Sequence, residues 1–428
     1  MKRWKKIASA ALAGIMAISL AACGGKDGTD TESKNAEGGG KELIVAIWDT
    51  QQEPGLTEIT DKFTEDTGIK CKIQVTPWDQ YWTMLEAGAT GGSMPDVFWM
   101  HSNMINQYAE YDMLLDLTDA IAKSNVDLSK YPEGLVSLYQ NKDGKQIGIP
   151  KDMDTSALWY NKNMFDEAGI AYPDDTWTWD TLAETANKLT KDDGSQYGFV
   201  ISPAANQEGY YNMIYDWGGE IISEDMKTSG WDNPKTIEAM QFIERLTKDG
   251  SMPSYNTIAE NEPIALLQSG KVAMCLLGSW HLAAMADNEY AQEHCDISVL
   301  PSYNGKRISI YNGLAWSASA GTSKKEEAAQ LVTYLGSEEA QKMQADLGVT
   351  MAAYDGVSEG FAKKYEIYNV QAYLDMMDDV VMRPYSKNTT IWEDMSQEKL
   401  VSAWDGSSGM EEVCKEIANE MNKALASE

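Results

Sequence analysis

The segment from residue 43 to residue 100 constrains the fold most, because its hydrophobic period switches back and forth. Leu43 to Trp48 is a continuous apolar run of strand length, as expected for a strand covered on both faces. Leu56, Ile59 and Phe63 then recur at helical spacing. Cys71, Ile73 and Val75 alternate with polar residues, as in a strand, and helical spacing returns at Trp78, Tyr81, Trp82 and Leu85. Another short strand is predicted at 97–100. Strands that alternate with helices in this way predict an α/β lobe with a largely parallel sheet.

The same patterns continue along the chain. Strands are predicted at 146–150, 157–160, 197–201, 272–277, 297–300 and 313–317, and helices at 179–191, 234–249, 324–335 and 338–347. The last segment repeats apolar residues on one helical face, namely Met410, Val413, Cys414, Ile417, Met421 and Leu425. A terminal amphipathic helix is therefore expected to dock on the body. About 390 residues follow the first 40, which is too long for a single core and indicates two lobes.

The first 22 residues have the pattern of a secretion signal. Lys2, Arg3, Lys5 and Lys6 precede an apolar run, residues 7–20, that is too short to favour a membrane-spanning helix. The run ends in Leu20-Ala21-Ala22-Cys23, which resembles the lipobox of bacterial lipoproteins. This resemblance implies that Cys23 is lipidated and becomes the new N-terminus, on the outer face of the cell membrane. Each buried methylene of the acyl chains adds about 0.8 kcal/mol, so the anchor is firm.

Residues 23–40 are predicted to be the lipidated cysteine and a flexible tether. From Gly24 to Gly40 the only apolar residue is Ala36, so the segment cannot form a core. A random coil of this length reaches roughly 20–25 Å. The folded body would therefore stay near the membrane while reorienting freely.

Charge excludes two classes of partner. Removal of the four cations in the signal takes the formal net charge from −31 to −35. Such a surface repels nucleic acid and anionic lipid, so neither is expected to bind.

Cysteine and histidine spacing indicates neither a disulfide framework nor a metal site. Apart from Cys23 the cysteines are Cys71, Cys275, Cys295 and Cys414, with no close pair, so buried free thiols are expected and a bridge between Cys275 and Cys295 stays open. The histidines, His101, His281 and His294, are not at ligand spacing. We expect no metal and no cofactor.

Six short segments, taken together, resemble the family of extracellular solute-binding proteins that includes the maltose-binding protein, the sugar receptors of ABC importers. They are Met94-Pro95-Asp96-Val97-Phe98-Trp99-Met100-His101, Gly148-Ile149-Pro150, Leu158-Trp159-Tyr160-Asn161-Lys162-Asn163-Met164-Phe165, Trp217-Gly218-Gly219, Gly278-Ser279-Trp280 and Val299-Leu300-Pro301, with the lipobox before them. Their order and spacing match over nearly the whole mature chain.

The resemblance implies a two-lobe periplasmic-binding-protein-like fold of type II, with the ligand in a cleft between lobes joined by a hinge. The crossings are expected near Met153, Leu300 and Ala353. One lobe then comprises residues 41–153 plus 302–353, and the other 154–301 plus 354–428. The expected function is capture of a carbohydrate, an oligosaccharide in particular, by cleft closure and its delivery to ABC permease subunits. We expect a monomer with no catalytic residues.

A sugar site needs flat aromatic faces and polar groups that bind hydroxyls. The chain has 14 Trp and 21 Tyr but only 6 Phe, which favours rings with a polar tip. In α/β lobes ligands lie beyond the carboxyl ends of strands. The residues that end or follow predicted strands are therefore candidates: Trp48, Asp49, Trp99, His101 and Asn103.

Three candidates come from the resemblance. Asp154 matches a cleft acid of the maltose-binding protein, Trp280 matches a cleft aromatic, and Trp392 lies where another stacking aromatic is expected. Ser102-Asn103 departs from that relative, which has a charged pair there, so the same maltodextrin contacts are not implied.

Position gives further candidates. Trp217 precedes a Gly-Gly pair, and Asn312 precedes Gly313. Arg383 is an isolated cation that could bind a hydroxyl or a carboxylate, or form a surface salt bridge instead. Asp152 could belong to the hinge rather than to the site.

Other functions stay open at this point. A secreted glycoside hydrolase would use two carboxylates, but with 66 acidic residues a pair such as Asp152 and Asp154 does not identify one. The fold could also serve a receptor for a non-sugar solute such as a polyamine or peptide, since Asp49 and Asp154 could hold cations. A surface adhesin would need an exposed apolar or repeated face, and the pattern contains none.

Overall fold

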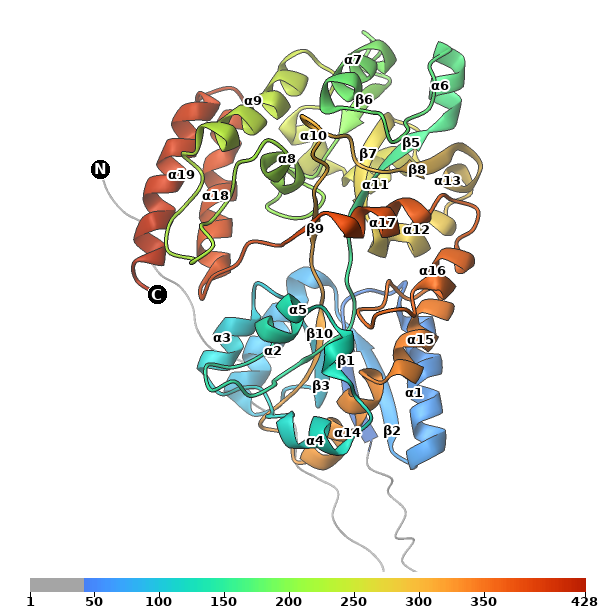
Figure 1. Cartoon of the computed structure of the whole chain (residues 1–428), viewed down its shortest axis with the longest axis vertical. Helices are drawn as coiled ribbons and strands as arrows, with labels where there is room; N and C mark the ends of the chain where they lie inside the picture. Colours follow the sequence, from blue (N-terminus) through green and yellow to red (C-terminus); the bar gives the residue numbers. More distant parts are fainter. Residues whose placement is uncertain (1–41) are drawn as a thin grey trace, which may run out of the picture. The chain divides into compact units, whose positions relative to one another are not determined.

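The computed structural model describes residues 42–428, whose two larger sheets build two α/β lobes (Figure 1). The predicted signal sequence, Cys23 and the tether lie outside the described residues. No helix of the described part is long and apolar enough to cross a membrane.

The first lobe contains a five-stranded sheet in the order β2-β1-β3-β10-β4. Its strands are β1 (Glu42–Ile47), β2 (Lys70–Val75), β3 (Val97–Met100), β4 (Ile149–Pro150) and β10 (Ala315–Ala318). β1 is parallel to β2 and β3, but β10 is antiparallel to β3 and to β4. The sheet is therefore mixed rather than largely parallel. β10 enters from the hinge and runs away from the cleft, whereas β3 runs toward it.

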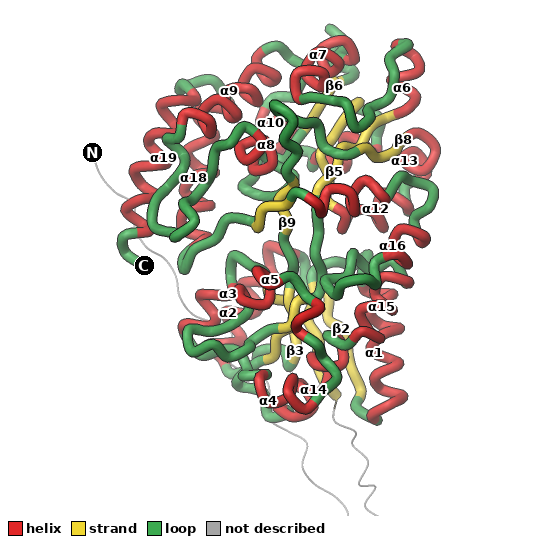
Figure 2. Tube along the Cα trace, in the orientation of Figure 1, coloured by secondary structure: helices red, strands yellow, loops and turns green. Residues whose placement is uncertain are grey.

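Helices flank this sheet (Figure 2). They are α1 (Glu53–Thr67), α2 (Trp78–Gly91), α3 (Ile105–Glu110), α4 (Thr118–Lys123), η1 (Leu128–Lys130), α5 (Glu133–Leu138), α14 (Lys325–Leu335) and α15 (Glu338–Asp346), with α16 (Glu359–Lys364) packed on α15. α1 buries Leu56, Ile59 and Phe63 and ends at Gly68, whose φ of 74° is the left-handed conformation that glycine tolerates. The helical spacing and the stop at this glycine are confirmed.

The second lobe contains a four-stranded sheet in the order β6-β7-β5-β8. Its strands are β5 (Ser156–Asn161), β6 (Tyr197–Val200), β7 (Val272–Gly278) and β8 (Cys295–Ser298). β5 is antiparallel to β7 and β8, and β6 is parallel to β7. β9 (Ser309–Tyr311) and β11 (Val380–Met382) form a separate parallel pair that the hydrophobic pattern did not predict.

Thirteen helices and 3-10 turns complete this part of the described chain. They are α6 (Lys162–Ala168), α7 (Trp179–Leu189), α8 (Tyr211–Asp216), α9 (Pro234–Lys248), α10 (Tyr255–Glu260), α11 (Pro263–Gln268), η2 (Ser279–His281), α12 (Leu282–Ala286), α13 (Glu289–His294), α17 (Gln371–Asp375), η3 (Met376–Asp378), α18 (Thr389–Trp404) and α19 (Met410–Leu425). All six apolar residues predicted for the face of α19 are buried, which confirms the docked terminal helix. Cys71, Cys275, Cys295 and Cys414 are free thiols, so Cys275 and Cys295 form no bridge; Cys71 is only partly buried, whereas the other three are buried as expected.

Three chain segments pass side by side between the lobes. Residues 151–154 leave β4 for β5, residues 312–314 lead from β9 into β10, and residues 350–353 follow α15. The backbones of Asp154 and Asn312 pair through two hydrogen bonds, of 2.8 and 3.2 Å. On the other side, Met153 N–H donates to Met351 O at 3.3 Å. These bonds hold the three crossings together as one hinge.

Residues that follow the expected second crossing near Leu300 still contact the second lobe. Ser302 pairs with the backbone of Trp177 and Trp179, and the ring of Tyr303 stacks on Trp217 at 4.1 Å. Ile310 N–H donates to Asn212 Oδ1 in α8 at 2.8 Å. Because residues 302–310 pack on helices of the second lobe, we propose a lobe boundary at 312–314.

Candidate ligand-binding site

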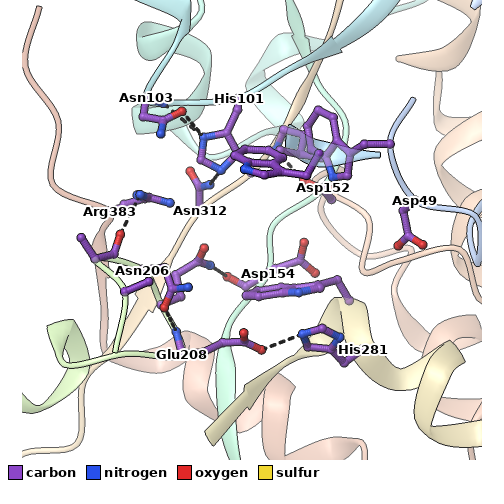
Figure 3. A pocket seen from close by; sticks show the side chains of 18 of the residues that line it. Asp49, His101, Asn103, Asp152, Asp154, Asn206, Glu208, His281, Asn312 and Arg383 are labelled. Carbon is purple, nitrogen blue, oxygen red and sulfur yellow. Dashed lines mark hydrogen bonds and ion pairs between the residues drawn. The ribbon is translucent and has the colours of Figure 1, made fainter. Parts of the chain in front are cut away.

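A cavity of about 660 Å³ lies between the lobes, within the roughly 300–1,000 Å³ typical of small-molecule sites. Its lining comes from both lobes and from the hinge (Figure 3). The first lobe contributes Trp48, Asp49, Thr50, Gln51, Gln52, Trp78, His101 and Asn103; the hinge contributes Asp152, Asp154, Asn312, Gly313 and Leu314; the second lobe contributes Ala204, Ala205, Asn206, Gln207, Glu208, Glu262, Trp280, His281, Ala284, Arg383, Glu393, Asp394 and Gln397.

The strand topology explains the first-lobe wall. β1 and β3 are parallel neighbours, so their carboxyl ends open at the same edge of the sheet. Trp48 and Asp49 follow β1, and His101 and Asn103 follow β3. The Asp49 carboxylate accepts from Gln51 N–H at 2.8 Å and from the Gln52 amide at 3.0 Å, which fixes the loop that carries it.

A hydrogen-bonded chain joins this wall to the hinge. His101 Nδ1 lies 2.6 Å from Asn103 Oδ1, and Asn312 Nδ2 lies 3.2 Å from His101 Nε2. These contacts suit a neutral imidazole with its proton on Nδ1. Burial, together with the charge of Arg383, lowers the pKa of His101 to about 3. His101 is therefore a neutral hydrogen-bonding group.

Two carboxylates lie on the hinge itself. Asp152 accepts from Lys151 Nζ at 2.7 Å and from Leu314 N–H at 2.5 Å. Asp154 Oδ1 accepts from Ser279 Oγ at 2.5 Å and from Thr350 Oγ1 at 3.0 Å, so it links the first crossing to η2, directly after β7, and to the third crossing. Burial, reinforced by the negative charge of Asp152, raises the pKa of Asp154 to about 7.

The second-lobe wall contains two ion pairs. Glu208 lies 3.0 Å from His281 Nε2 and accepts from Gly278 N–H at 2.6 Å. Burial lowers the pKa of His281, but the negative charges of Glu208, Asp49 and Glu262 outweigh this and raise it.

Arg383 forms the second ion pair. Its Nη2 donates to Glu393 at 2.7 Å and to Ala205 O at 2.8 Å. Tyr211 and Asn103 also donate to the Glu393 carboxylate, at 3.2 and 3.4 Å. Both members of the pair are almost fully buried. The guanidinium is thus held in place at the edge of the cavity.

Aromatic rings from both lobes border the cavity. Trp280 stands at the end of β7, and Trp48 and Trp78 stand on the opposite wall with ring centroids 5.1 Å apart at 84°. Trp78 remains 41% exposed. These half-exposed rings offer apolar faces beside the carboxylates and amides, which is the combination that a sugar ring requires.

A family model described as "Bacterial extracellular solute-binding protein" matches residues 48–342, well over half of the chain. The chain belongs to this family.

This solute-binding protein is 28% identical over 357 residues to the galactooligosaccharide-binding protein of Bacillus subtilis (strain 168), covering 80% of this chain and 79% of the relative. It is 25% identical over 343 residues to the diacetylchitobiose binding protein DasA of Streptomyces coelicolor, covering 77% of each. The fold is similar to that of the ABC substrate-binding protein Lmo0181 from Listeria monocytogenes, solved in complex with cycloalternan. The TM-score is 0.83 at 24% identity, over 90% of this chain and 99% of that one.

Eight residues that the sequence predicted for the site of this solute-binding protein line the cavity. They are Trp48, Asp49, His101, Asn103, Asp154, Trp280, Asn312 and Arg383. Asp152 belongs to the hinge and lines the cavity as well. Their contact with a ligand remains a prediction.

Three predicted residues lie elsewhere. Trp99 is fully buried in β3, where it packs on Trp48 and Trp316. Trp217 stacks on Tyr303 in the second lobe. Trp392 is fully buried in α18, and its indole N–H donates to Ser386 at 2.9 Å. Each ring is taken up by packing, so none lines the cavity.

Sequence reasoning missed several lining residues. Asn206, Gln207 and Glu208 lie in an irregular loop without a periodic pattern. Trp78 could have been found, because it follows β2 as Trp48 follows β1. His281 could have been found beside Trp280.

Within residues 42–428 no group of three or more His, Cys, Asp or Glu is arranged to hold a metal ion.

Proposed function

We propose that this protein is the lipid-anchored, extracytoplasmic receptor of an ABC importer and that it captures a carbohydrate, an oligosaccharide in particular. The single observation that carries the proposal is the cavity between the lobes, with Trp280 on one wall and Trp48 and Trp78 on the other. Apolar ring faces beside amides and carboxylates match the C–H faces and hydroxyl rim of a sugar. Relatives named for galactooligosaccharide and diacetylchitobiose binding support this choice of ligand.

The proposed mechanism is closure of the lobes about the hinge. A sugar ring stacks on Trp280 in the open form, and closure brings the Asp49 and His101 wall against it. The closed form then docks on the permease subunits. Micromolar affinity, about −8 kcal/mol, permits both capture and release.

Catalysis is not part of the proposal. The family and the named relatives are binding proteins. Asp152 is neutralised by Lys151 at 2.7 Å, and Asp154 accepts two hydroxyl hydrogen bonds. Both carboxyl groups are held by hinge contacts, and the proposal assigns them no catalytic role. Incubation with neutral oligosaccharides should release no new reducing ends.

A thermal-shift screen tests the ligand class. The purified mature protein is heated with neutral oligosaccharides, spermidine and short peptides. A ligand at roughly 100 times its dissociation constant adds about 2.7 kcal/mol to the free energy of unfolding. We expect a rise in melting temperature with one class of saccharide only. A rise with spermidine or peptides alone would contradict the proposed carbohydrate.

The anchor has its own test. Cys23 should hold the protein in the membrane fraction of cells that express the full chain. Cys23→Ala should move the protein to the medium or the soluble fraction. Retention of this variant in the membrane fraction would contradict lipidation at Cys23.

A further inference from the structure

The cavity lining is strongly acidic. Seven carboxylates line it, and they are spread over both lobes and the hinge: Asp49, Asp152, Asp154, Glu208, Glu262, Glu393 and Asp394. Asp49, Glu208 and Glu262 lie close enough to His281 to raise its pKa against the effect of burial. Acidic side chains therefore line both lobes and the hinge, and three of them, Asp152, Glu208 and Glu393, are paired with basic groups.

Three basic groups near the cavity, Lys151, His281 and Arg383, each form an ion pair with a carboxylate. Arg383 donates through Nη2 to Glu393 and to Ala205 O, and its buried Nε has no hydrogen-bond partner within residues 42–428. His281 pairs with Glu208 at 3.0 Å, and the neighbouring Lys151 is held by Asp152 and by Gln52 Oε1 at 2.9 Å. No cation among the described lining residues is left without an acidic partner to receive a carboxylate, sulfate or phosphate.

The hinge residue Asn312 has a buried acceptor oxygen without a hydrogen-bond partner in the described part of the chain. Asn312 is 4% exposed, its Nδ2 donates to His101, and its Oδ1 has no hydrogen-bond partner in the described protein. Figure 3 shows this amide between His101 and Asp154 at the cavity. A buried acceptor without a partner costs about 1–3 kcal/mol, so a ligand that donates a hydrogen bond there is favoured. Hydroxyl groups donate, whereas an ionised acid group only accepts.

We infer that the cleft selects uncharged, hydroxyl-rich saccharides and rejects saccharides that carry acid groups such as uronates. The inference rests on the proposed function and specifies its substrate class. Surplus acceptors favour a donor-rich ligand, and the unbalanced carboxylates repel an anion within a low-dielectric cleft. This repulsion is screened by salt wherever the cleft is open to solvent.

Matched ligand pairs test the selection. Neutral oligosaccharides of galactose, glucose and N-acetylglucosamine are titrated into the purified mature protein. Each is paired with the same oligosaccharide oxidised at C6 to the uronate. For the sugar that binds, we expect the neutral oligosaccharide to bind at least tenfold more tightly than its uronate counterpart at 20 mM salt. The ratio should fall at 500 mM salt.

The outcomes separate the two proposals. Equal or tighter binding of a uronate would overturn the charge selection and leave the carbohydrate receptor standing. If none of the neutral or oxidised saccharides binds, the proposal of a carbohydrate receptor is overturned, and the inference with it.

A charge-neutralising variant tests the cause. Glu262 is exposed at the start of α11 and lines the cavity, so Glu262→Gln should be tolerated by the fold. This variant should lower the ratio of neutral to uronate affinity about two- to threefold. The control Glu326→Gln removes the same charge from α14, away from the cavity lining, and should leave the ratio unchanged. An unchanged ratio in Glu262→Gln would overturn the electrostatic explanation.

Discussion

Lys387 Nζ lies 2.8 Å from Glu110 Oε1 and joins the segment before α18 to the end of α3. The two residues belong to different lobes and lie 277 positions apart in the chain. Next to this ion pair, Asn106 Nδ2 donates to Ser386 O at 3.0 Å. A second connection between the lobes therefore exists away from the hinge.

We predict that this connection contributes modestly to closure. Both side chains are over 40% exposed, and pairs of this kind contribute about 0–1 kcal/mol. Lys387→Ala should weaken ligand binding by at most about fivefold, with a larger radius of gyration in small-angle scattering. Lys342→Ala, which breaks the pair with Asp346 inside α15, should alter neither quantity. Tighter binding by Lys387→Ala would contradict the proposed role in closure.

Stability should depend on the protonation of Asp154. Burial and the charge of Asp152 raise its pKa from 3.8 to about 7 in the native state. Because the native carboxyl binds its proton more tightly than the unfolded chain does, its contribution to the free energy of unfolding rises as pH falls from about 7 to about 4. Asp154→Asn removes this dependence and keeps an oxygen for Ser279 and Thr350. The melting temperature of the native protein should therefore fall, relative to that of the variant, between pH 5 and pH 8.

Asp216 provides a matched control for that prediction. Burial raises its pKa to about 8, and it accepts from Trp179 Nε1 at 2.7 Å, outside the cavity lining. Asp216→Asn should also change the pH dependence of the melting temperature but leave ligand affinity within twofold. Asp154→Asn should change both. Equal ligand affinity in the native protein and Asp154→Asn would remove Asp154 from the proposed site.

Gly278 should be required for the position of Trp280. A Cβ built on Gly278 would lie 2.0 Å from the Trp280 ring, so an added methyl group would displace the ring. Gly278 has φ −79°, which alanine adopts without strain. Gly278→Ala should therefore weaken sugar binding about tenfold in a titration. Gly409 serves as the control, because it has φ −77° and no atoms lie near an added Cβ. The Gly409→Ala variant should therefore bind sugar normally.

Local patterns predicted much of the fold. α1 and α19 follow helical spacing over several turns, and β1 is one apolar run, so their burial could be read from neighbouring residues. β9 and β11 could not be predicted in the same way. Each has three residues, and their pairing joins segments about 70 positions apart.

Part of the candidate site could be predicted from the strand ends, although the same rule also selected Trp99, which does not line the cavity. Asp49 and His101 could be placed by the rule that ligands lie beyond strand carboxyl ends. The position of Trp392 could not be predicted in this way, because the packing of α18 on α19 determines which side of α18 faces the cavity. Glu393, its neighbour in the chain, lines the cavity instead. Glu208 comes from a loop whose shape no local pattern determines.

Titration calorimetry on the native protein and on Trp280→Ala tests the central claim most directly. One neutral oligosaccharide series should saturate the native protein at one ligand per chain with micromolar affinity. Trp280→Ala should bind it at least tenfold more weakly, a loss of about 1.4 kcal/mol, because the ring forms one wall of the cavity. Trp217→Phe should bind normally, because Trp217 stacks on Tyr303 instead. If no saccharide saturates the native protein, or if Trp280→Ala binds within twofold of it, the assignment of this cleft as a sugar site is wrong.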